Sequence, residues 1–341
     1  MAERVLTLRE LNRATLARQL LLRRVRLRLV QAVARLAGLQ AQWAPAPYVG
    51  LWTRLEGFQR DSLERALLRR TVARGVLMRG TVHLVSAGDY ALFGAALDNA
   101  PPGWVTPQAL GVAARLREPL RAFMAEPRTK AEVYDWLARD HGIEVDESLG
   151  LWYALRLQAR IAHAPESGVW RSPQRPRFVA ADDPGIEPER ARVELMRRYL
   201  GAFGPATRAE MATWSGVRVR DLRPALESLE PLRRFRDEQG SELYDIPRAP
   251  LPAAEARAPV RFLPKWDNTL LDRPTLLPDE YRPAVVRSNT DVEQTFLVDG
   301  LVAGVWRFKD GRVETQSFAP LPPAARHELE DEARRLAAWL R

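Results

Sequence analysis

The fold is decided by the stretch Val76-Leu77-Met78-Arg79-Gly80-Thr81-Val82-His83-Leu84-Val85. Residues 76–78 and 81–85 are rich in β-branched and other apolar side chains, and Arg79-Gly80 between them is typical of a tight turn, so the stretch predicts a β-hairpin. Three segments of helical periodicity precede it. This order of three helices and a two-stranded hairpin is that of a winged helix, a module that usually places a helix or its hairpin wing in a DNA groove.

The three helices before the hairpin have recognisable start and stop signals. Thr7 and Glu10 form a capping-box pattern ahead of leucines at helical spacing, which predicts a first helix that ends near Leu22. A second helix is expected over residues 30–37 and a third over residues 61–75, and each would be stopped by a glycine.

Two glutamines lie just after the second helix, in the stretch Gly38-Leu39-Gln40-Ala41-Gln42-Trp43. No acidic or basic side chain occurs from residue 36 to residue 53, so this stretch is polar without being charged. We expect Pro45 and Pro47 to prevent regular structure in the loop that follows and to stiffen it. Three aromatic residues lie nearby, and each is expected either to pack in the core or to stack on a base or sugar. They are Trp43, Tyr48 and Trp52.

An internal repeat extends the winged-helix pattern. Pro127–Trp136 and Pro205–Trp214 match in Pro, Thr, Ala, Glu and Trp at a constant offset of 78 residues. In each copy Thr and Glu form a capping box, a helix precedes it, and a further helix and a hairpin follow. The flanking helices are expected over residues 110–125, 148–160, 188–202 and 219–229. The hairpins are expected to pair Ile161–Ala164 with Val169–Trp170 or a later strand, and Leu232–Arg236 with Leu243–Ile246. The repeat therefore predicts two further winged helices.

The pattern changes to β-type after a Pro- and Ala-rich linker at residues 247–259. Asp299-Gly300 and Asp310-Gly311 are typical hairpin turns between short apolar runs. The runs cover residues 261–263, 285–287, 295–298, 301–308 and 312–317, and an amphipathic helix over residues 323–341 follows them. We expect the strands to form a small, partly closed β-barrel.

The predicted fold class is therefore α+β, with three tandem winged-helix domains followed by a small β-barrel. A chain of 341 residues has room for two to four such units. The expected boundaries are residues 1–105, 106–185 and 186–250 for the three winged helices and 251–341 for the barrel with its last helix.

Positive charge is concentrated in the first of these domains. Residues 1–80 contain 16 Arg and five acidic residues, whereas the rest of the chain holds 36 basic and 38 acidic residues. A local basic excess favours contact with a polyanion, most commonly nucleic acid. Codon bias is the alternative explanation for the many arginines, but it does not account for a chain that is neutral elsewhere.

The composition disfavours several other classes of chemistry. The chain has no Cys, which excludes disulfides and thiolate metal sites and indicates a reducing cytoplasm, and its four His lack metal-ligand spacing. It has no P-loop, no Gly-x-Gly-x-x-Gly and no Gly-x-Ser-x-Gly. With no apolar run of 18 residues and no signal peptide, we expect no membrane association. We expect neither a metal ion nor a cofactor.

Some polar residues have structural explanations beside the catalytic ones. Ser86 lies near His83 but is typical of a turn or helix cap. Asp182-Asp183 and Glu330-Asp331-Glu332 are expected to be solvated surface. Strand alternation predicts that His83 faces outward, opposite its apolar neighbours, toward whatever the wing contacts. An ordinary surface histidine is the alternative.

Three segments together resemble the AlkZ/YcaQ-type winged-helix DNA glycosylases. They are Leu39–Tyr48 with its Gln-x-Gln, Arg79–Ser86 with its Thr-x-His, and Leu263-Pro264-Lys265-Trp266-Asp267 with the residues up to Arg273. The resemblance runs from Leu8 to about Phe318. It implies three winged helices and a β-barrel in a C-shaped arrangement around duplex DNA. It also implies excision of N7-alkylated purines, including bulky adducts or interstrand crosslinks, in DNA repair or in self-resistance to alkylating natural products.

By matching position, the resemblance implies that Gln40 and Gln42 are the catalytic pair and that Thr81 and His83 lie in the wing near the lesion. The YcaQ branch has Gln-x-Asp at the first site, so Gln42 makes this chain similar to the AlkZ branch. Arg79 and Trp43 are further candidates for contact with the lesion. Candidates for phosphate contact are Arg23, Arg24, Arg26, Arg28, Arg69 and Arg70.

Glutamine cannot act as a general base, which limits the reaction that such a pair could catalyse. An N7-alkylguanine already carries a positive charge and leaves as a neutral base without protonation. Amide dipoles could then stabilise the developing sugar cation and bind the attacking water. Our hypothesis is that Gln42 positions the water and Gln40 stabilises the cation. A crosslinked base cannot be rotated fully out of the helix, so a projecting hairpin would suit that substrate.

Two alternatives remain at this stage. A non-catalytic multi-winged-helix DNA-binding protein, such as a transcriptional regulator, fits the charge and the repeat equally well. A structural or partner-binding protein that uses the β-barrel leaves the basic segment unexplained. For the glycosylase, the expected partner is double-stranded DNA carrying an alkylated purine, bound by a monomer in the cytoplasm at the nucleoid.

Overall fold

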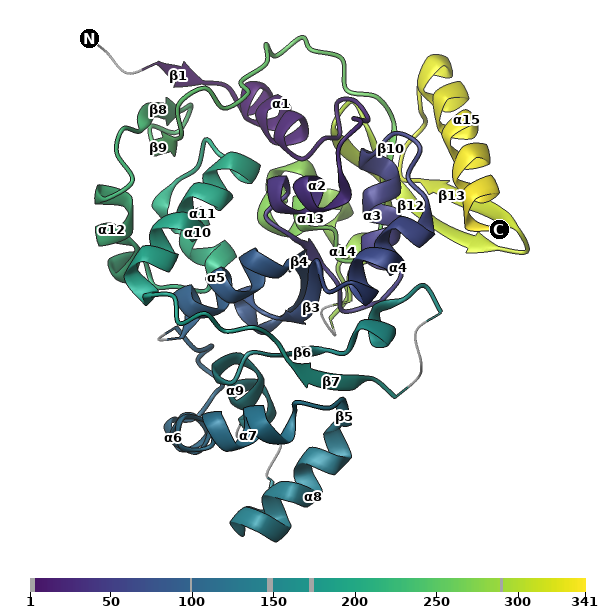
Figure 1. The fold of residues 1–341 in the computed structure, drawn as a ribbon. Helices are drawn as coiled ribbons and strands as arrows, with labels where there is room; N and C mark the ends of the chain where they lie inside the picture. The colour runs from purple at the N-terminus through teal and green to yellow at the C-terminus, as the bar shows by residue number, and fades with distance from the viewer. Residues whose placement is uncertain (1–3, 99, 146–149, 172–174, 289–290) are drawn as a thin grey trace.

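The computed structural model describes residues 4–98, 100–145, 150–171, 175–288 and 291–341. Over these residues the chain is a mixed α+β structure built on three sheets (Figure 1). The first two residues of the helix expected over 148–160 lie outside the described residues. No helix in the described ranges combines the length and the apolar character that a membrane span requires.

A six-stranded antiparallel sheet lies at the centre and combines strands from the first two predicted domains. Its order is β2 (Leu39–Gln40), β4 (Val82–Ser86), β3 (Val72–Val76), β6 (Ile161–His163), β7 (Arg177–Ala180) and β5 (Arg128–Thr129). The predicted hairpin supplies β3 and β4. Because β4 pairs with β2 on one side and β3 pairs with β6 on the other, the hairpin is an interior part of the sheet. The expectation of a projecting wing at residues 76–85 is therefore wrong.

The hairpin also begins earlier than the sequence predicted. The preceding helix ends at Leu68, and Gly75, expected to end it, lies in β3 opposite His83. A Cβ atom at Gly75 would lie 2.5–2.8 Å from the ring of Tyr90, so the ring packs where a side chain would stand. Met78–Gly80 form the turn as a single 3₁₀ segment, with Arg79 in the left-handed region at φ 56°.

The helices reproduce most of the predicted order. The three capping boxes are present at Thr7, Thr129 and Thr207, each with the expected Glu. The helices are α1 (Leu8–Arg18), α2 (Leu29–Arg35), α3 (Ala46–Arg54), α4 (Arg60–Leu68), α5 (Ala87–Leu97), α6 (Pro107–Arg115), α7 (Arg117–Phe123), α8 (Lys130–His141), α9 (Leu151–Gln158), α10 (Pro188–Phe203), α11 (Arg208–Ser215), α12 (Val219–Glu227), α13 (Asn268–Asp272), α14 (Arg282–Val285) and α15 (Pro323–Leu340).

Three predictions of secondary structure need correction. The first helix stops at Arg18, before Leu22. Pro45 and Pro47 do not prevent regular structure but begin α3, since the first turn of a helix leaves its N–H groups without acceptors and tolerates proline. Residues 285–287 do not form a strand within a sheet, because α14 ends at Val285 and only an isolated bridge joins Val286 to Val292.

The other two sheets are smaller. In one, β1 (Val5–Leu6) runs parallel to β8 (Arg233–Asp237), which pairs with β9 (Glu242–Asp245), so the N-terminal strand joins the third repeated unit. In the other, β10 (Arg261–Leu263), β11 (Thr295–Val298), β12 (Leu301–Lys309) and β13 (Arg312–Ser317) form an antiparallel sheet. Its described strands do not close into the expected barrel. Helix α15 packs against β13 (Figure 1).

Two large hydrophobic clusters join segments that are distant in sequence. One extends from Ala37 to Tyr244 and packs α5 against α10, so the repeated units share a core. The other packs α2, α3 and α4 against the four-stranded sheet and α15. The second cluster thus connects segments near the two ends of the chain. Residues 263–273 contribute to a third cluster, with Leu263 and Leu270, and Asn268 joins this segment to β2 by hydrogen bonds.

Candidate active site

Gln40 and Gln42 lie at one edge of the central sheet. Gln40 is the last residue of β2 and stands opposite His83 of β4, and its side chain is nearly buried, with 6% of its surface exposed. Gln42 follows on the surface and is exposed. The Nε2 of Gln40 donates a hydrogen bond of 2.5 Å to Oε1 of Gln42. The structure thus brings together the two amides that the sequence singled out.

The backbone of this stretch is held on both sides. Ala41 N donates to Val82 O at 2.7 Å, which extends the β2–β4 pairing by one residue. The guanidinium of Arg74 donates to the carbonyl oxygens of Ala41 at 2.8 Å and Gln42 at 3.3 Å. Arg74 is itself buried, and this burial lowers its pKa to about 10. Hydrogen bonds to the main chain therefore hold the loop in place, and the amide side chains are not needed for that purpose.

Asn268, which lies much later in the sequence, holds the same loop through two hydrogen bonds. Its Oδ1 accepts from Gln40 N at 2.8 Å, and its Nδ2 donates to Gly38 O at 3.1 Å. Asn268 begins α13, whose N-cap is Asp267. Asp267 in turn forms a bidentate ion pair with Arg54 of α3, at 2.8 and 2.9 Å, and both side chains are fully buried.

Sequence reasoning did not predict that Asn268, Arg54 and Arg74 hold the glutamine loop. Arg74 lies in the range 69–79, whose arginines were candidates for phosphate contact, but it is buried against the loop. The pattern Asp267-Asn268-Thr269 could have been read as a helix cap, since Asp267 accepts from Thr269 N. The family resemblance grouped its segment with residues 39–48, but nothing local in either segment indicates the contact between Asn268 and residue 40.

Arg79 faces the inside of the protein. Its Nη1 lies 2.8 Å from Asp272 Oδ1 and 2.9 Å from Trp214 O, and its Nη2 lies 3.5 Å from Gln40 Oε1. Burial raises the pKa of Asp272 to about 6, and its Oδ2 has no hydrogen-bond partner among the described residues. The neighbouring Thr81 is partly buried and donates its hydroxyl to Met78 O at 3.1 Å.

The prediction that His83 faces outward is wrong. Its exposed fraction is 0%, because the strand that carries it is interior to the sheet and is covered on both faces. Its Nδ1 donates to Thr81 O at 3.0 Å, and Nε2 has no partner in the described chain. Burial, with a smaller contribution from Arg79, lowers the pKa of His83 to about 3. The side chain is therefore neutral, and it stands beside Gln40 in the β2–β4 pairing with no exposed surface.

The three aromatic residues near the glutamines separate into two groups. Tyr48 and Trp52 pack in the core, where Tyr48 contacts Trp170 edge-on and Trp52 lies against Trp339. Trp43 is 39% exposed and directly follows the exposed Gln42. Of the three, only Trp43 is placed so that it could stack on a base or sugar.

The arginines proposed for phosphate contact also differ from one another. Arg24 is mostly buried, pairs with Glu332 of α15 and lies over the ring of Trp52, so its predicted role as a free phosphate contact is not supported by its position. Arg26 is exposed and pairs with Glu56 at 2.9 Å. The remaining candidates are exposed: Arg23, Arg28, Arg69 and Arg70.

Ser86 and the acidic pairs have structural roles. Ser86 is the N-cap of α5 and accepts from Asp89 N at 3.0 Å, as its cap-like context suggested. Asp183 is not solvated surface, since its side chain is 7% exposed and pairs with Arg117. Glu332 is likewise buried against Arg24, whereas Asp182, Glu330 and Asp331 are exposed as predicted. None of these residues belongs to the glutamine site.

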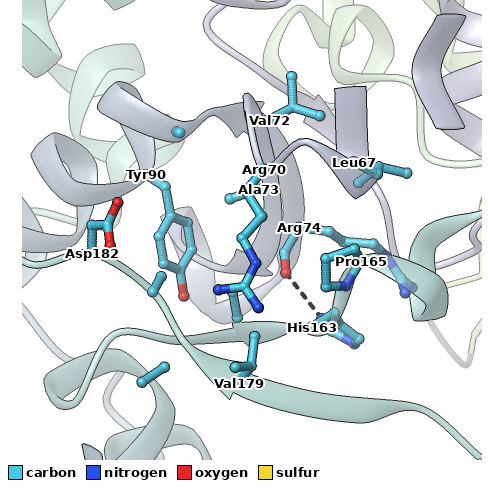
Figure 2. A pocket seen from close by; sticks show the side chains of 14 residues that line it. Leu67, Arg70, Val72, Ala73, Arg74, Tyr90, His163, Pro165, Val179 and Asp182 are labelled. Carbon is cyan, nitrogen blue, oxygen red and sulfur yellow. Dashed lines mark hydrogen bonds between the residues drawn. The ribbon is translucent and has the colours of Figure 1, made fainter. Parts of the chain in front are cut away.

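A separate pocket of about 70 Å³, partly open to solvent, lies against β3, β6 and β7 (Figure 2). Arg70 points into it between Tyr90 and His163, and His163 Nδ1 donates to Arg74 O at 3.2 Å. Burial keeps the pKa of His163 well below its usual value. The lining does not include Gln40 or Gln42, so the cavity is distinct from the glutamine site.

A known protein, a solved structure and a family model each match most of this chain. The chain is 25% identical over 338 residues to the interstrand DNA cross-link repair glycosylase of Streptomyces sahachiroi, with 89% of each chain covered. The solved structure of the Streptomyces sahachiroi DNA glycosylase AlkZ superposes with a TM-score of 0.82 at 22% identity, covering 98% of this chain and 97% of that one. A family model described as DNA glycosylase AlkZ-like matches residues 33–339, and the chain therefore belongs to the AlkZ-like family of DNA glycosylases.

Proposed function

We propose that this DNA glycosylase hydrolyses the N-glycosidic bond of N7-alkylated purines in duplex DNA, including bulky adducts and interstrand crosslinks. The observation that carries the proposal is the pair of hydrogen-bonded amides, Gln40 and Gln42, at the exposed edge of the sheet. In the described chain no carboxylate or imidazole forms a hydrogen bond with either amide. A site without an acid suits a base that is already cationic and needs no proton to leave.

The neutral state of His83 supports the same choice of substrate. Its pKa of about 3 means that it is not an imidazolium at neutral pH and cannot serve as a general acid, although it is the ionisable side chain opposite Gln40 in the strand pairing. Asp272 is separated from Gln40 by Arg79. The reaction then depends on water delivery and on dipoles aimed at the developing sugar cation, each plausibly worth about 2–4 kcal/mol.

The exposure of Gln42 supports the inclusion of large lesions. A site that encloses its base in a deep pocket requires the base to be flipped out, which a crosslink between strands prevents. Gln42 lies on the surface next to Trp43, which is 39% exposed, so the sugar could be reached in place. The cross-link repair named for the Streptomyces sahachiroi relative is consistent with this proposal.

We further propose that the chain acts as a monomer and curves around the duplex as a C-shaped set of three winged-helix units, at residues 1–105, 106–185 and 186–250, with residues 251–341 as a fourth unit. The repeated capping boxes of α8 and α11, each followed by a helix and paired strands, support this division. Repair of chromosomal DNA or self-resistance to an alkylating natural product would both use this activity.

The test is single-turnover excision from a duplex that contains one N7-methylguanine, followed by alkaline cleavage of the abasic product. We expect wild-type protein to give strand cleavage and Gln42→Ala to lose at least about 100-fold in rate. Gln31→Ala, an exposed glutamine on α2, is the matched control and should keep the wild-type rate. Binding without cleavage of methylated, bulky and crosslinked duplexes would instead indicate a non-catalytic DNA-binding protein.

A further inference from the structure

Gln40 is in contact with a buried ion pair that the reaction described above does not use. Arg79, in the turn between β3 and β4, pairs with Asp272 at the end of α13, and the carboxylate side chain of Asp272 is 2% exposed. The backbone around the turn is unusual, with Arg79 at φ 56° followed by Gly80 at φ 75°. This turn directs the guanidinium inward, where it also donates to Trp214 O of α11. A surface arginine in a wing would need none of these contacts.

The chemistry of the guanidinium determines which way the Gln40 amide faces. A guanidinium has donors and no acceptor, so only the oxygen of the amide can face it favourably. Arg79 Nη2 lies 3.5 Å from Gln40 Oε1, a long contact, and the other end of the amide, Nε2, lies 2.5 Å from Gln42 Oε1. If the Gln40 amide were reversed, its NH₂ would face the guanidinium and two carbonyl oxygens would face each other.

We propose that Asp272 and Arg79 are positioning residues that fix the orientation of the Gln40 amide, and through it the orientation of Gln42. The proposal rests on the glycosylase function given above and refines the roles of the two glutamines. Gln42 is the exposed member that meets the sugar and the water, whereas Gln40 is nearly buried and acts through Gln42. The stabilisation of the sugar cation, first assigned to Gln40, thereby passes to Gln42.

Asp272 has a second effect, because it balances the charge of Arg79. An unbalanced guanidinium beside the amides would repel both a cationic purine and the sugar cation that forms from it. Arg273 and Asp267 are the other charged groups that act on Asp272, and each has its own ion-pair partner, in Glu210 and Arg54. Arg79 is thus the cation that Asp272 is placed to neutralise.

The experiment compares Arg79→Met, Asp272→Asn and the double variant on an N7-methylguanine duplex. The excision rate constant at saturating protein and the Kd for the uncleaved duplex are measured separately. We expect each single variant to lose at least about tenfold in rate, since a catalytic group is misplaced, while Kd stays within about threefold. The double variant should be no slower than Asp272→Asn, because both residues act by orienting the same Gln40 amide and their effects are therefore not additive. Arg79→Lys should recover part of the rate.

Arg223→Met is the matched control, since it removes an exposed ion pair with Glu227 on α12 at 2.8 Å, and it should keep the wild-type rate. A parallel loss of rate and binding in Arg79→Met would identify a DNA contact and overturn the proposal. Multiplicative losses in the double variant would also overturn it, as would a wild-type rate in Arg79→Met. Urea unfolding of each variant separates misfolding from these outcomes.

A readout independent of activity separates this inference from the proposed function. The side-chain amide signals of Gln40 and Gln42 in a ¹⁵N correlation spectrum are assigned by their absence in Gln40→Ala and Gln42→Ala. We expect Arg79→Met to shift both signals, and Arg223→Met to shift neither. If wild type releases no base, the proposed function fails while this measurement still applies. If wild type is active but the Gln42 signal does not move in Arg79→Met, the positioning role fails alone.

Discussion

Asn268→Ala should weaken both the fold and the reaction, because it removes the side chain that clamps the glutamine loop. The amide of Asn268 is 1% exposed and satisfies two buried main-chain groups, the N–H of Gln40 and the carbonyl of Gly38. Each group left without a partner costs about 1–3 kcal/mol. Partial relaxation of the loop reduces the sum, so we expect a loss of about 2–4 kcal/mol in the free energy of unfolding, against a total of about 5–15 kcal/mol for a folded protein.

The effect on excision should exceed the effect on binding. Without its clamp, Gln40 N is free to move away from α13, and a displacement of about 1 Å at a catalytic group can cost about 100-fold in rate. The free energy of unfolding is measured by urea denaturation followed by circular dichroism, and the rate constant by single-turnover excision below the unfolding transition. Asn268→Asp keeps the acceptor for Gln40 N but cannot donate to Gly38 O, so it should fall between wild type and Asn268→Ala in rate.

The matched control is Asn12→Ala, which removes a partly buried amide that donates to Gly300 O at 2.9 Å, remote in sequence from the glutamines. It should reduce stability without slowing excision selectively. The reasoning is refuted if Asn268→Ala unfolds within about 1 kcal/mol of wild type, below the cost of one orphaned group. It is refuted equally if Asn268→Ala is destabilised as expected but excises at the wild-type rate, since the clamp would then have no part in placing Gln40.

Three further outcomes are expected. His83 has a pKa of about 3 in the folded state, against 6.5 in the unfolded state, so the stability it contributes is fully present above pH 6.5 and is lost as pH falls toward 3. The difference in the free energy of unfolding between wild type and His83→Leu, measured with urea, should shrink by up to about 1.4 kcal/mol per pH unit in that window. A difference that stays constant with pH would contradict the burial argument. Arg69→Met should reduce the slope of the logarithm of the DNA association constant against the logarithm of the salt concentration by about 1, measured by anisotropy titrations. An unchanged slope would mean that Arg69 does not contact DNA. Gly75→Ala should cost about 1–3 kcal/mol in the free energy of unfolding, because the new Cβ atom would overlap the Tyr90 ring. The double variant Gly75→Ala with Tyr90→Leu should recover part of this loss, and wild-type stability in the single variant would show that the ring is free to move.

Local signals in the sequence predicted most of the elements but not their partners. The capping boxes at Thr7, Thr129 and Thr207 are properties of four consecutive residues, and all three are present. Gly75 was wrongly predicted to end a helix, because glycine occurs both at helix ends and in strands where another side chain packs closely. Here it leaves room for Tyr90, a tertiary reason that its neighbours in sequence do not reveal.

The same limit explains the error at His83. Alternation along a strand assigns two faces correctly, but it predicts exposure only if one of those faces meets solvent. Residues 83–86 of β4 are all buried, so both faces of the strand are covered and neither meets solvent. Arg24 shows the corresponding limit for charge, since its partner Glu332 lies 308 residues away. The family resemblance covered both the glutamines and the segment of Asn268, but the hydrogen bond that joins them spans 228 residues and has no local signal.

The use of amides where many glycosidases use carboxylates follows from the movement of charge. When an N7-alkylpurine leaves, the positive charge passes from the base to the sugar, and the total charge of the substrate stays the same. A catalyst gains rate only from interactions that are stronger in the transition state than in the ground state. A carboxylate would attract the cation at both stages, whereas an amide dipole acts over a shorter range and favours the nearer centre, the sugar. The groups around Gln40 fit this requirement, because His83 is neutral and Asp272 balances Arg79, so these groups add no net charge that would favour the ground state.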